Sequence, residues 1–267
     1  LNIRSLPCNF DSLVDYLNLL NISFPIIGLT ETWLNEDNES IYSLPNYSMH
    51  SVCRSERRGG GVAVLYHHFL NATPITDLSL LDEHIETTFI EITPSPSWDV
   101  KALVGVVYRP PSSNINSFLQ SFADLLNRVN SYGKLSFIMG DFNINLLDTD
   151  AHTPVDNFID LIYTNSFRPL IDQATRITPT SSTLIDNILC NDITHHQTSG
   201  LLHTDISDHL PLFSFFATSQ CRAPYDCDQA TTYRIINTDT MNACNDQLAT
   251  VDWTEVLASD NAEAAFQ

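Results

Sequence analysis

Hydrophobic residues follow two different spacings along the first 217 positions of the chain. From Phe10 to Leu20, from Ile115 to Val129 and from Val155 to Tyr163 they recur every three or four residues, which predicts three amphipathic helices. Elsewhere, short apolar runs bounded by glycine, proline or small polar residues predict strands. The predicted strands are Leu1 to Leu6, Pro25 to Leu29, Tyr47 to Cys53, Gly61 to Tyr66, Glu86 to Ile92, Lys101 to Val107, Leu135 to Met139, Leu184 to Cys190 and Leu210 to Phe216.

The order of these elements indicates an α/β fold. Strands outnumber helices, and four of them follow one another without an intervening helix, so some strands must pair antiparallel. We therefore expect two mixed β-sheets packed face to face, with the helices on the outside.

The domain organisation follows from length and from a change in pattern near the C-terminus. With 267 residues, 43% of them hydrophobic, the chain can form one large domain with a full core, which we place at residues 1–217. The apolar periodicity is lost after Thr218, so residues 218–267 are expected to hold a linker and the start of a truncated downstream region. Because Leu1 replaces an initiating methionine, we expect the chain to be a fragment of a longer protein.

Composition restricts the location and the partners. No apolar run approaches the roughly 20 residues of a membrane span, and six scattered cysteines without a CxxC pair indicate free thiols in a reducing, intracellular compartment. The net charge of −20, from 12 basic and 32 acidic residues, opposes simple electrostatic binding of a polyanion. Contacts to phosphates would have to be local and assisted by metal ions. Arg54, Arg57 and Arg58 could provide one, or could equally form a solvated basic face.

Polar residues at the ends of predicted strands are the candidates for chemistry. Glu31 ends one apolar strand, and Asp141 and Asn143 follow another. On an extended segment, Asp141 and Asn143 would face the same way, with Phe142 pointing into the core. Carboxylate and amide oxygens suit Mg²⁺, which hydrolysis of a phosphodiester can use. Taken alone, Glu31 is better explained as a surface acid at a strand end. For the GDxN segment taken alone, an Asx turn and a catalytic role have about equal weight.

A second group surrounds the tripeptide Ser207-Asp208-His209. Ser207 can fix a loop from which Asp208 and His209 point to one place, and Asp186 is the candidate carboxylate that orients the imidazole. A capped turn with an exposed histidine is the alternative. Tyr108 and Arg109, at another strand end, supply a phenol and a guanidinium; their alternatives are a core-edge aromatic and a surface cation.

Taken together and in order, these motifs resemble the endonuclease/exonuclease/phosphatase superfamily over residues 1–217. Within it, TETWL and YRPP resemble the apurinic-type endonuclease domain of non-long-terminal-repeat (LINE-like) retrotransposons. The motif residues are Asn2 in LNIRSL, Glu31 in LTETWL, Tyr108 in VVYRPP, Asp141 and Asn143 in MGDFN, Asp186 in TLIDNIL, and Asp208 and His209 in SDHLPLF.

The resemblance implies a four-layer, DNase I-like sandwich and a nuclease that nicks one DNA strand. The implied nuclease requires Mg²⁺, for which Mn²⁺ can substitute. The nick leaves a 3′-hydroxyl, which primes reverse transcription. The implied partners are DNA and, through the downstream region, the element RNA, with no membrane and no small-molecule cofactor. The implied place of action is the nucleus.

The resemblance also implies a role for each site residue. Glu31 is the principal metal ligand, with Asn2 and Asp208 near the metal. Asp141 positions or deprotonates the water. The remaining roles are a phosphate-binding pair, Asn143 and Tyr108; a phosphate-contacting His209, oriented by Asp186; and Thr175, which would match a family threonine that touches the DNA backbone. From the residues themselves we also expect Arg109 and Ser207 to bind substrate.

Two other functions stay open at this point. A phosphatase or abasic-site repair nuclease on the same scaffold is favoured by the acidic charge, since a small substrate needs no basic groove. A remnant that keeps the fold but does not cut is the non-enzymatic alternative.

Overall fold

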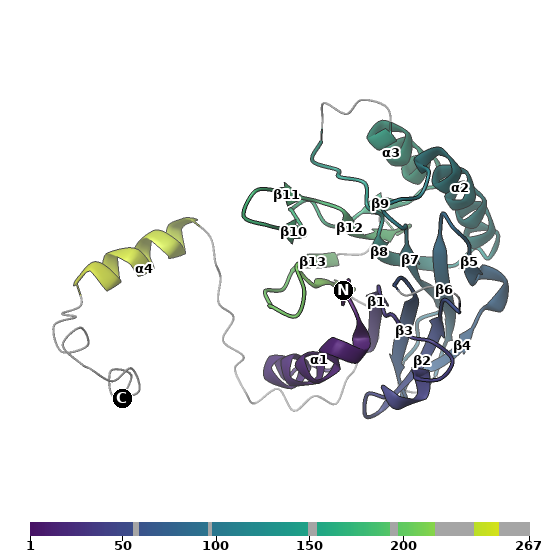
Figure 1. The fold of residues 1–267 in the computed structure, drawn as a ribbon, viewed down its shortest axis with the longest axis horizontal. Helices are drawn as coiled ribbons and strands as arrows, with labels where there is room; N and C mark the ends of the chain where they lie inside the picture. The colour runs from purple at the N-terminus through teal and green to yellow at the C-terminus, as the bar shows by residue number, and fades with distance from the viewer. Residues whose placement is uncertain (56–58, 96–97, 149–153, 193–196, 217–237, 251–267) are drawn as a thin grey trace. The chain divides into compact units, whose positions relative to one another are not determined.

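The protein is described from a computed structural model, which covers residues 1–55, 59–95, 98–148, 154–192, 197–216 and 238–250 (Figure 1). The chain divides into two compact units, Leu1–Arg222 and Ala223–Gln267. The described part of the second unit is one helix, α4 (Thr238–Thr250). The predicted linker, which falls within residues 217–237, and the last 17 residues lie outside the described residues, so the interpretation of residues 218–267 stays a prediction.

The first unit contains two facing β-sheets. The helices are α1 (Leu6–Leu20), α2 (Ile115–Ser131) and α3 (Pro154–Thr164), with short 3₁₀ turns η1 (Glu39–Ile41) and η2 (Thr76–Leu78). The strands are β1 (Ile26–Thr30), β2 (Tyr47–Val52), β3 (Val62–His67), β4 (Asn71–Pro74), β5 (Leu80–Leu81), β6 (Glu86–Thr93), β7 (Ala102–Tyr108), β8 (Leu135–Asp141), β9 (Arg168–Pro169), β10 (Arg176–Ile177), β11 (Ser182–Thr183), β12 (Asp186–Cys190), β13 (Gln197–Leu201) and β14 (Leu212–Phe216).

The larger sheet has seven strands in the order β4-β6-β7-β8-β12-β9, with β5 also paired to β6. It is mixed, because β7 and β8, joined through α2, run parallel while their neighbours are antiparallel. The smaller sheet has the order β1-β3-β2, antiparallel throughout, with a parallel bridge from Asn2 to Thr30 at its edge. Two hairpins, β10–β11 and β13–β14, complete the pairing.

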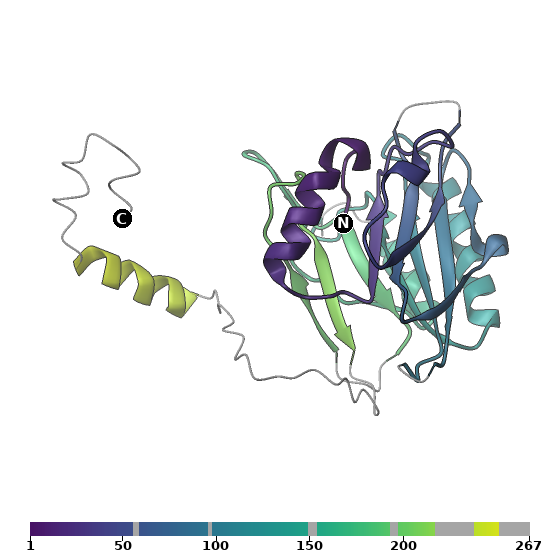
Figure 2. The ribbon, with the colours of Figure 1, turned by 90° about the horizontal axis from the view of Figure 1, so that it is seen from below.

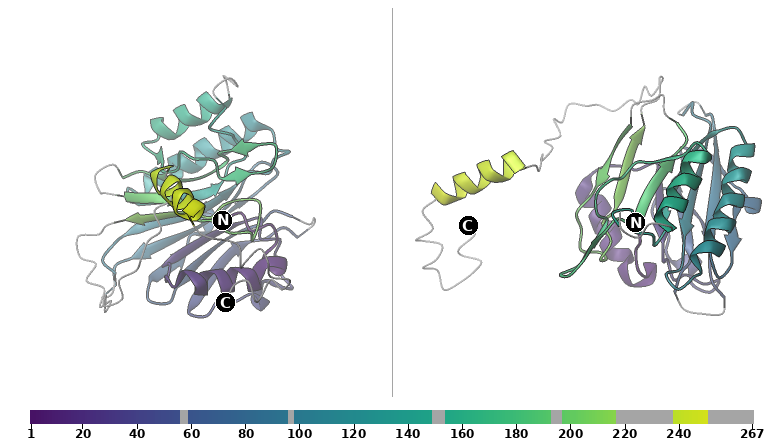
Figure 3. Two further views of the ribbon diagram at one scale, coloured as in Figure 1. Left: turned by 90° about the vertical axis from the view of Figure 1, so that its left-hand side faces the viewer. Right: turned by 90° about the horizontal axis from the view of Figure 1, so that it is seen from above.

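Three apolar clusters separate four layers. Helices α2 and α3 cover the outer face of the larger sheet through a group that includes Phe118, Phe122 and Phe158. Helix α1 covers the smaller sheet through Leu6 and Leu13. Figures 2 and 3 show α1 on one side of the stacked sheets and α2 with α3 on the other. The predicted α/β sandwich of two sheets flanked by helices is therefore confirmed, and it has the DNase I-like form.

Both faces of the central strands are buried, which explains their continuous apolar sequences. In β6, Phe89 belongs to the cluster under the outer helices and Ile90 to the cluster between the sheets; Leu103 and Val104 divide in the same way. This alternation follows from the two-residue period of a strand.

The predicted N-terminal strand is wrong over most of its length. Asn2 makes the single bridge to Thr30, and α1 already begins at Leu6. The extended chain ends because Arg4 and Ser5 have φ values of 45° and 91°. Pro7 then falls in the first helical turn, where its missing N–H has no partner to lose.

Two composition-based expectations can be compared with the structure. Cys8, Cys53 and Cys190 are free thiols, and the side chains of the other three cysteines lie outside the described part. Among the described residues, no helix is long and apolar enough to cross a membrane.

Candidate active site

Three neighbouring strands of the larger sheet align polar residues in one row. In the β7–β8 ladder Tyr108 lies opposite Asp141, and in the β8–β12 ladder Asp141 lies opposite Asp186. Tyr108 and Asp141 end their strands, whereas Asp186 begins β12 because β12 runs in the opposite direction. Adjacent strands are about 4.8 Å apart, so residues from three distant segments become neighbours.

The smaller sheet contributes Asn2 and Glu31 to the same place. The Asn2 amide nitrogen donates to Glu31 Oε1 and to Asp141 Oδ2, each at 2.9 Å. The two carboxylate oxygens thus cannot be further apart than twice that length. Asn2 and Asp141 are almost fully buried, and Glu31 is half-buried. The facing sheets therefore bring two acids from different layers around one amide.

Glu31 has a strained backbone, with φ at 53° in the left-handed region. This conformation costs a residue other than glycine about 1 kcal/mol or more. The turn also lets the backbone at Thr32 and Trp33 donate to the carbonyls of Gly61 and Gly60. Strain of this kind at a polar strand end is typical of functional sites.

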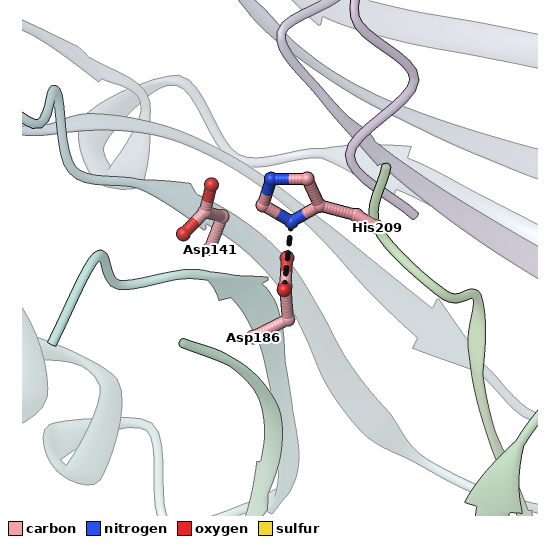
Figure 4. Close-up of side chains that lie close together, drawn as sticks. All are labelled: Asp141, Asp186 and His209. Atoms are coloured by element: carbon pink, nitrogen blue, oxygen red, sulfur yellow. Dashed lines mark hydrogen bonds and ion pairs between the residues drawn. The ribbon is translucent and has the colours of Figure 1, made fainter. Parts of the chain in front are cut away.

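His209 and Asp186 form the second half of the site (Figure 4). His209 Nδ1 lies 2.8 Å from Asp186 Oδ2, and both side chains are nearly buried. The Thr175 hydroxyl donates to the same Asp186 oxygen at 2.7 Å. In Figure 4 the other ring nitrogen of His209 is on the side facing Asp141. The carboxylate thus orients the imidazole as the sequence predicts.

Burial and charge shift the pKa values of these groups. Burial, and then the nearby Asp186, raise the pKa of Asp141 to about 8. Burial lowers the pKa of His209, but the hydrogen bond and charge of Asp186 outweigh it and leave that pKa above its usual value. Burial, followed by the charges of Glu31 and Asp141, raises the pKa of Tyr108, so its hydroxyl keeps its proton. The site therefore holds a poised base, a favoured cation and a phenol donor near neutral pH.

The residues present fit a divalent cation. Asp141, Asp186 and His209 can each offer one ligand atom within 4.8 Å of the others. One Glu31 oxygen and one Asp141 oxygen accept from the same Asn2 amide, and carboxylate oxygens are the ligands that hard divalent cations prefer. Buried carboxylates that repel one another are also stabilised by a cation. Glu31 and Asp141, with Asn2 beside them, are the residues that would hold such an ion.

Asn143 does not lie as its spacing from Asp141 predicts. Strand β8 ends at Asp141 and Asn143 has φ at 50°, so the backbone is not extended there and the argument for a shared face is wrong. Instead, the Asn143 backbone N–H donates to Asp141 Oδ1 at 3.0 Å, and its amide donates to the Arg109 carbonyl at 2.8 Å. This is the Asx turn of the alternative interpretation. Phe142 does point into the core.

Arg109 is buried rather than a surface cation. Its guanidinium donates to the carbonyls of Asn143 and Ser113 and lies 5.8 Å from the ring centre of Phe118. These contacts connect the loop after β7 to the loop after β8. Arg109 therefore braces the site, and its contact with substrate stays a prediction.

Ser207 and Asp208 precede His209 in one loop and have different partners. The Ser207 hydroxyl donates to the Asn2 carbonyl at 2.7 Å and accepts from the His209 N–H at 3.2 Å, which fixes the loop as predicted. Asp208 does not converge with His209. Its two carboxylate oxygens bind the guanidiniums of Arg4 and Arg176, and it is not part of the group formed by Asp141, Asp186 and His209.

Sequence reasoning missed two contributors. Arg4 and Arg176 gave no local pattern, because their shared partner is more than 30 positions away from each. Arg54 is neither a phosphate contact nor a solvated cation, since it pairs with the fully buried Glu86. Arg57 and Arg58 lie outside the described residues.

A four-layer α/β sandwich with acids and a histidine gathered at its strand ends is the architecture of DNase I-like nucleases and phosphatases. Residues 1–209 match the endonuclease/exonuclease/phosphatase family, and the chain belongs to that family. No curated protein matches the chain by sequence.

Solved structures share this fold at low sequence identity. The endonuclease domain of TRAS1, a telomere-specific non-LTR retrotransposon, is 13% identical with a TM-score of 0.60, covering 81% of this chain and 97% of that one. The catalytic domain of Xenopus laevis APE2 is 18% identical with a TM-score of 0.61, covering 82% and 93%. The catalytic domain of human Nocturnin is 14% identical with a TM-score of 0.56, covering 81% of this chain and 92% of that one.

Proposed function

We propose that the protein is a Mg²⁺-dependent endonuclease that nicks one strand of DNA and leaves a 3′-hydroxyl, which primes reverse transcription of a retroelement. The observation that carries the proposal is the convergence of Asn2, Glu31 and Asp141 beside the Asp186–His209 pair. The likeness to the TRAS1 endonuclease domain supports the retroelement context. In this proposal the nick is made in the nucleus, and the region after residue 217 leads to the domain that engages the element RNA.

The proposed reaction needs a base, a charge stabiliser and a leaving-group proton. Asp141, buried beside Asn2 and in register with Asp186, accepts the proton of the attacking water. The water oxygen bonds to phosphorus while the bond from phosphorus to the 3′ oxygen breaks, and the 3′ oxygen takes up a proton. Bound Mg²⁺ supplies positive charge to the phosphoryl oxygens.

Protein donors act on the same charge. His209, kept in its charged form by Asp186, donates to a phosphoryl oxygen through the ring nitrogen that Asp186 does not use. Tyr108 donates from a hydroxyl that stays protonated. Thr175 keeps Asp186 in place, so in this proposal it positions the histidine; binding of the DNA backbone by Thr175 and Ser207 stays a prediction.

The experiment is a nicking assay on supercoiled plasmid with and without Mg²⁺. Conversion to open circles that a DNA polymerase can extend is the expected result, since extension requires a free 3′-hydroxyl. Asp141→Ala and His209→Ala are the loss-of-function variants. Lys101→Gln is the control, because Lys101 is exposed and lies at the other end of β7, about 20 Å from Tyr108 along the strand.

The net charge of −20 favours a second candidate, a phosphatase or a repair nuclease on the same fold. An abasic duplex and an inositol phosphate are therefore tested beside the plasmid. Release of inorganic phosphate without plasmid nicking would establish the phosphatase, and cutting confined to the abasic duplex would establish the repair nuclease. Inactivity on all substrates with intact folding would indicate a non-catalytic remnant.

A further inference from the structure

A pair of arginines lies beside the candidate active site and shares one carboxylate. Arg4 Nη1 is 2.8 Å from Asp208 Oδ1, and Arg176 binds Asp208 Oδ2 through Nε and Nη2, both at 2.8 Å. The arginine side chains are 51% and 40% exposed, against 25% for Asp208. We call this group the arginine pair.

The arginine pair is connected to the site by the backbone. The Arg4 N–H donates at 3.2 Å to the side-chain oxygen of Asn2, the residue that joins Glu31 and Asp141. Arg176 forms a β-bridge with His209. The backbones of Arg4 and Arg176 are therefore bonded directly to Asn2 and His209, two residues of the candidate site.

The charges and donors of the pair suit a phosphate. Two guanidiniums and one carboxylate leave a net charge of +1, in a chain whose total is −20. Each guanidinium has five N–H donors, and the bonds to Asp208 use one from Arg4 and two from Arg176. The remaining donors belong to half-exposed groups, and planar guanidiniums match phosphate oxygens in pairs.

The backbone at Arg4 supports a functional placement. Its φ of 45° puts it in the left-handed region, at a cost of about 1 kcal/mol or more. An arginine needs no such conformation to stay solvated. The strained turn directs the chain from the bridge at Asn2 into α1 while Arg4 reaches Asp208, more than 200 positions away.

We propose that Arg4 and Arg176 form a binding site for a DNA backbone phosphate adjacent to the one that is cleaved, and that Asp208 is the positioning residue that holds them. The proposal rests on the proposed endonuclease function. It also replaces the metal role that the family resemblance implies for Asp208, since both of its oxygens already bind guanidiniums.

The first test measures DNA binding without metal. A fluorescein-labelled duplex is titrated in EDTA, by anisotropy, between 25 and 150 mM salt, values chosen to span about a sixfold range in which the slope of affinity against salt is resolved. Arg4→Gln, Arg176→Gln and the double variant are compared with Lys101→Gln, which removes one positive charge far from the site, as each single variant does beside it. A plot of the logarithm of affinity against the logarithm of salt concentration has a negative slope. We expect the double variant to make that slope shallower by about 0.9, the value for one lost phosphate contact, and each single variant to weaken binding several-fold. A slope equal to that of Lys101→Gln overturns the proposal.

The second test concerns Asp208 and the metal. We expect Mg²⁺ to raise the melting temperature of Asp208→Asn as much as that of the wild type. In Glu31→Gln we expect Mg²⁺ to leave the melting temperature unchanged. If Asp208→Asn loses the effect as well, Asp208 is a metal ligand and the proposal is wrong.

These readouts separate the two proposals. Binding through the arginines without plasmid nicking would refute the endonuclease function alone. Nicking by the wild type, together with unchanged binding by the arginine variants, would refute the arginine pair alone. Circular dichroism confirms that the variants fold, and the single variants replace the double variant if it does not.

Discussion

The raised pKa of Asp141 predicts that the metal-free protein loses stability as pH rises from 5 to 6.5. In this window the unfolded chain has lost the Asp141 proton, because its pKa there is 3.8, whereas the folded protein keeps it until about pH 8. The folded state binds more protons, so its stability falls with rising pH. Asp141→Asn cannot release a proton, and its stability should depend less on pH.

The magnitude follows from linkage. One proton of difference is worth about 1.4 kcal/mol per pH unit, so 1.5 units give at most about 2 kcal/mol. For a domain of this size that corresponds to about 4 to 8 °C in melting temperature. The histidines contribute little to the comparison. The raised pKa of His209 keeps it charged in the folded state, and the unfolded chain loses that proton only towards the top of the range, in both proteins. The lowered pKa values of His50 and His67 likewise act equally on both proteins.

The assay is thermal unfolding in EDTA at pH 5, 5.5, 6 and 6.5, a series chosen so that it does not exceed the usual pKa of histidine at about 6.5. The comparison uses the slope of stability against pH rather than the absolute stability. The amide that Asp141→Asn introduces would place an N–H donor against the Asn2 amide, which is also a donor, and this would shift the whole curve by a constant. Asp208→Asn is the matched control. The pKa of Asp208 is raised by burial but lowered overall to about 2 by Arg4, Arg176 and His209, so it is ionised in both states throughout. Equal slopes for the wild type and Asp141→Asn would refute the reasoning.

Three further predictions follow from the same contacts. Asp141→Ala or His209→Ala should reduce nicking at least about 100-fold with unchanged circular dichroism, because each removes a proton-transfer or charge-stabilising group; a smaller loss would argue against the site. Asp186→Asn should lower the pKa of His209, so a pH–rate profile should lose more activity at pH 8 than at pH 6, whereas a uniform loss would contradict the role of Asp186. Arg54→Met should destabilise the protein by about 3 kcal/mol in urea unfolding, because it takes a guanidinium from the buried Glu86; combining it with Glu86→Gln should recover part of that loss.

Periodicity was sufficient to predict most elements of the fold because the central strands are buried on both faces and the helices on one. Strands β2, β3, β6 and β7 begin within one residue of the predicted positions. The pairing register could not be predicted in this way. Three site residues share one row of the sheet, Tyr108, Asp141 and Asp186. Their alignment depends on β7 and β8 running parallel and on β12 running antiparallel, which no local spacing encodes.

Site residues could be predicted where they stand at strand ends. The prediction failed where the backbone changes conformation. Glu31 and Asp141 end apolar runs, and a strand end at the sheet edge is visible in sequence. At Asn143 a left-handed φ changes the direction of the side chain, although the two-residue spacing indicates the same face. Asparagine tolerates that conformation, so the residue type carried the information and the spacing did not.

The strong negative charge and a DNA substrate are compatible if binding depends on a small number of local cations. A net charge of −20 reduces the long-range attraction that brings DNA to a basic surface, so association should be slow at low salt. At the site, however, Arg4 and Arg176 add positive charge on one side and charged His209 adds it on the other, while Mg²⁺ would neutralise Glu31 and Asp141. Affinity would then depend on phosphate contacts at a few positions, and its dependence on salt would be shallow compared with that of a basic nuclease of the same size. The same arrangement would restrict productive binding to DNA whose backbone shape places two successive phosphates on the arginine pair and the histidine, so target choice would depend on duplex deformability rather than on overall charge.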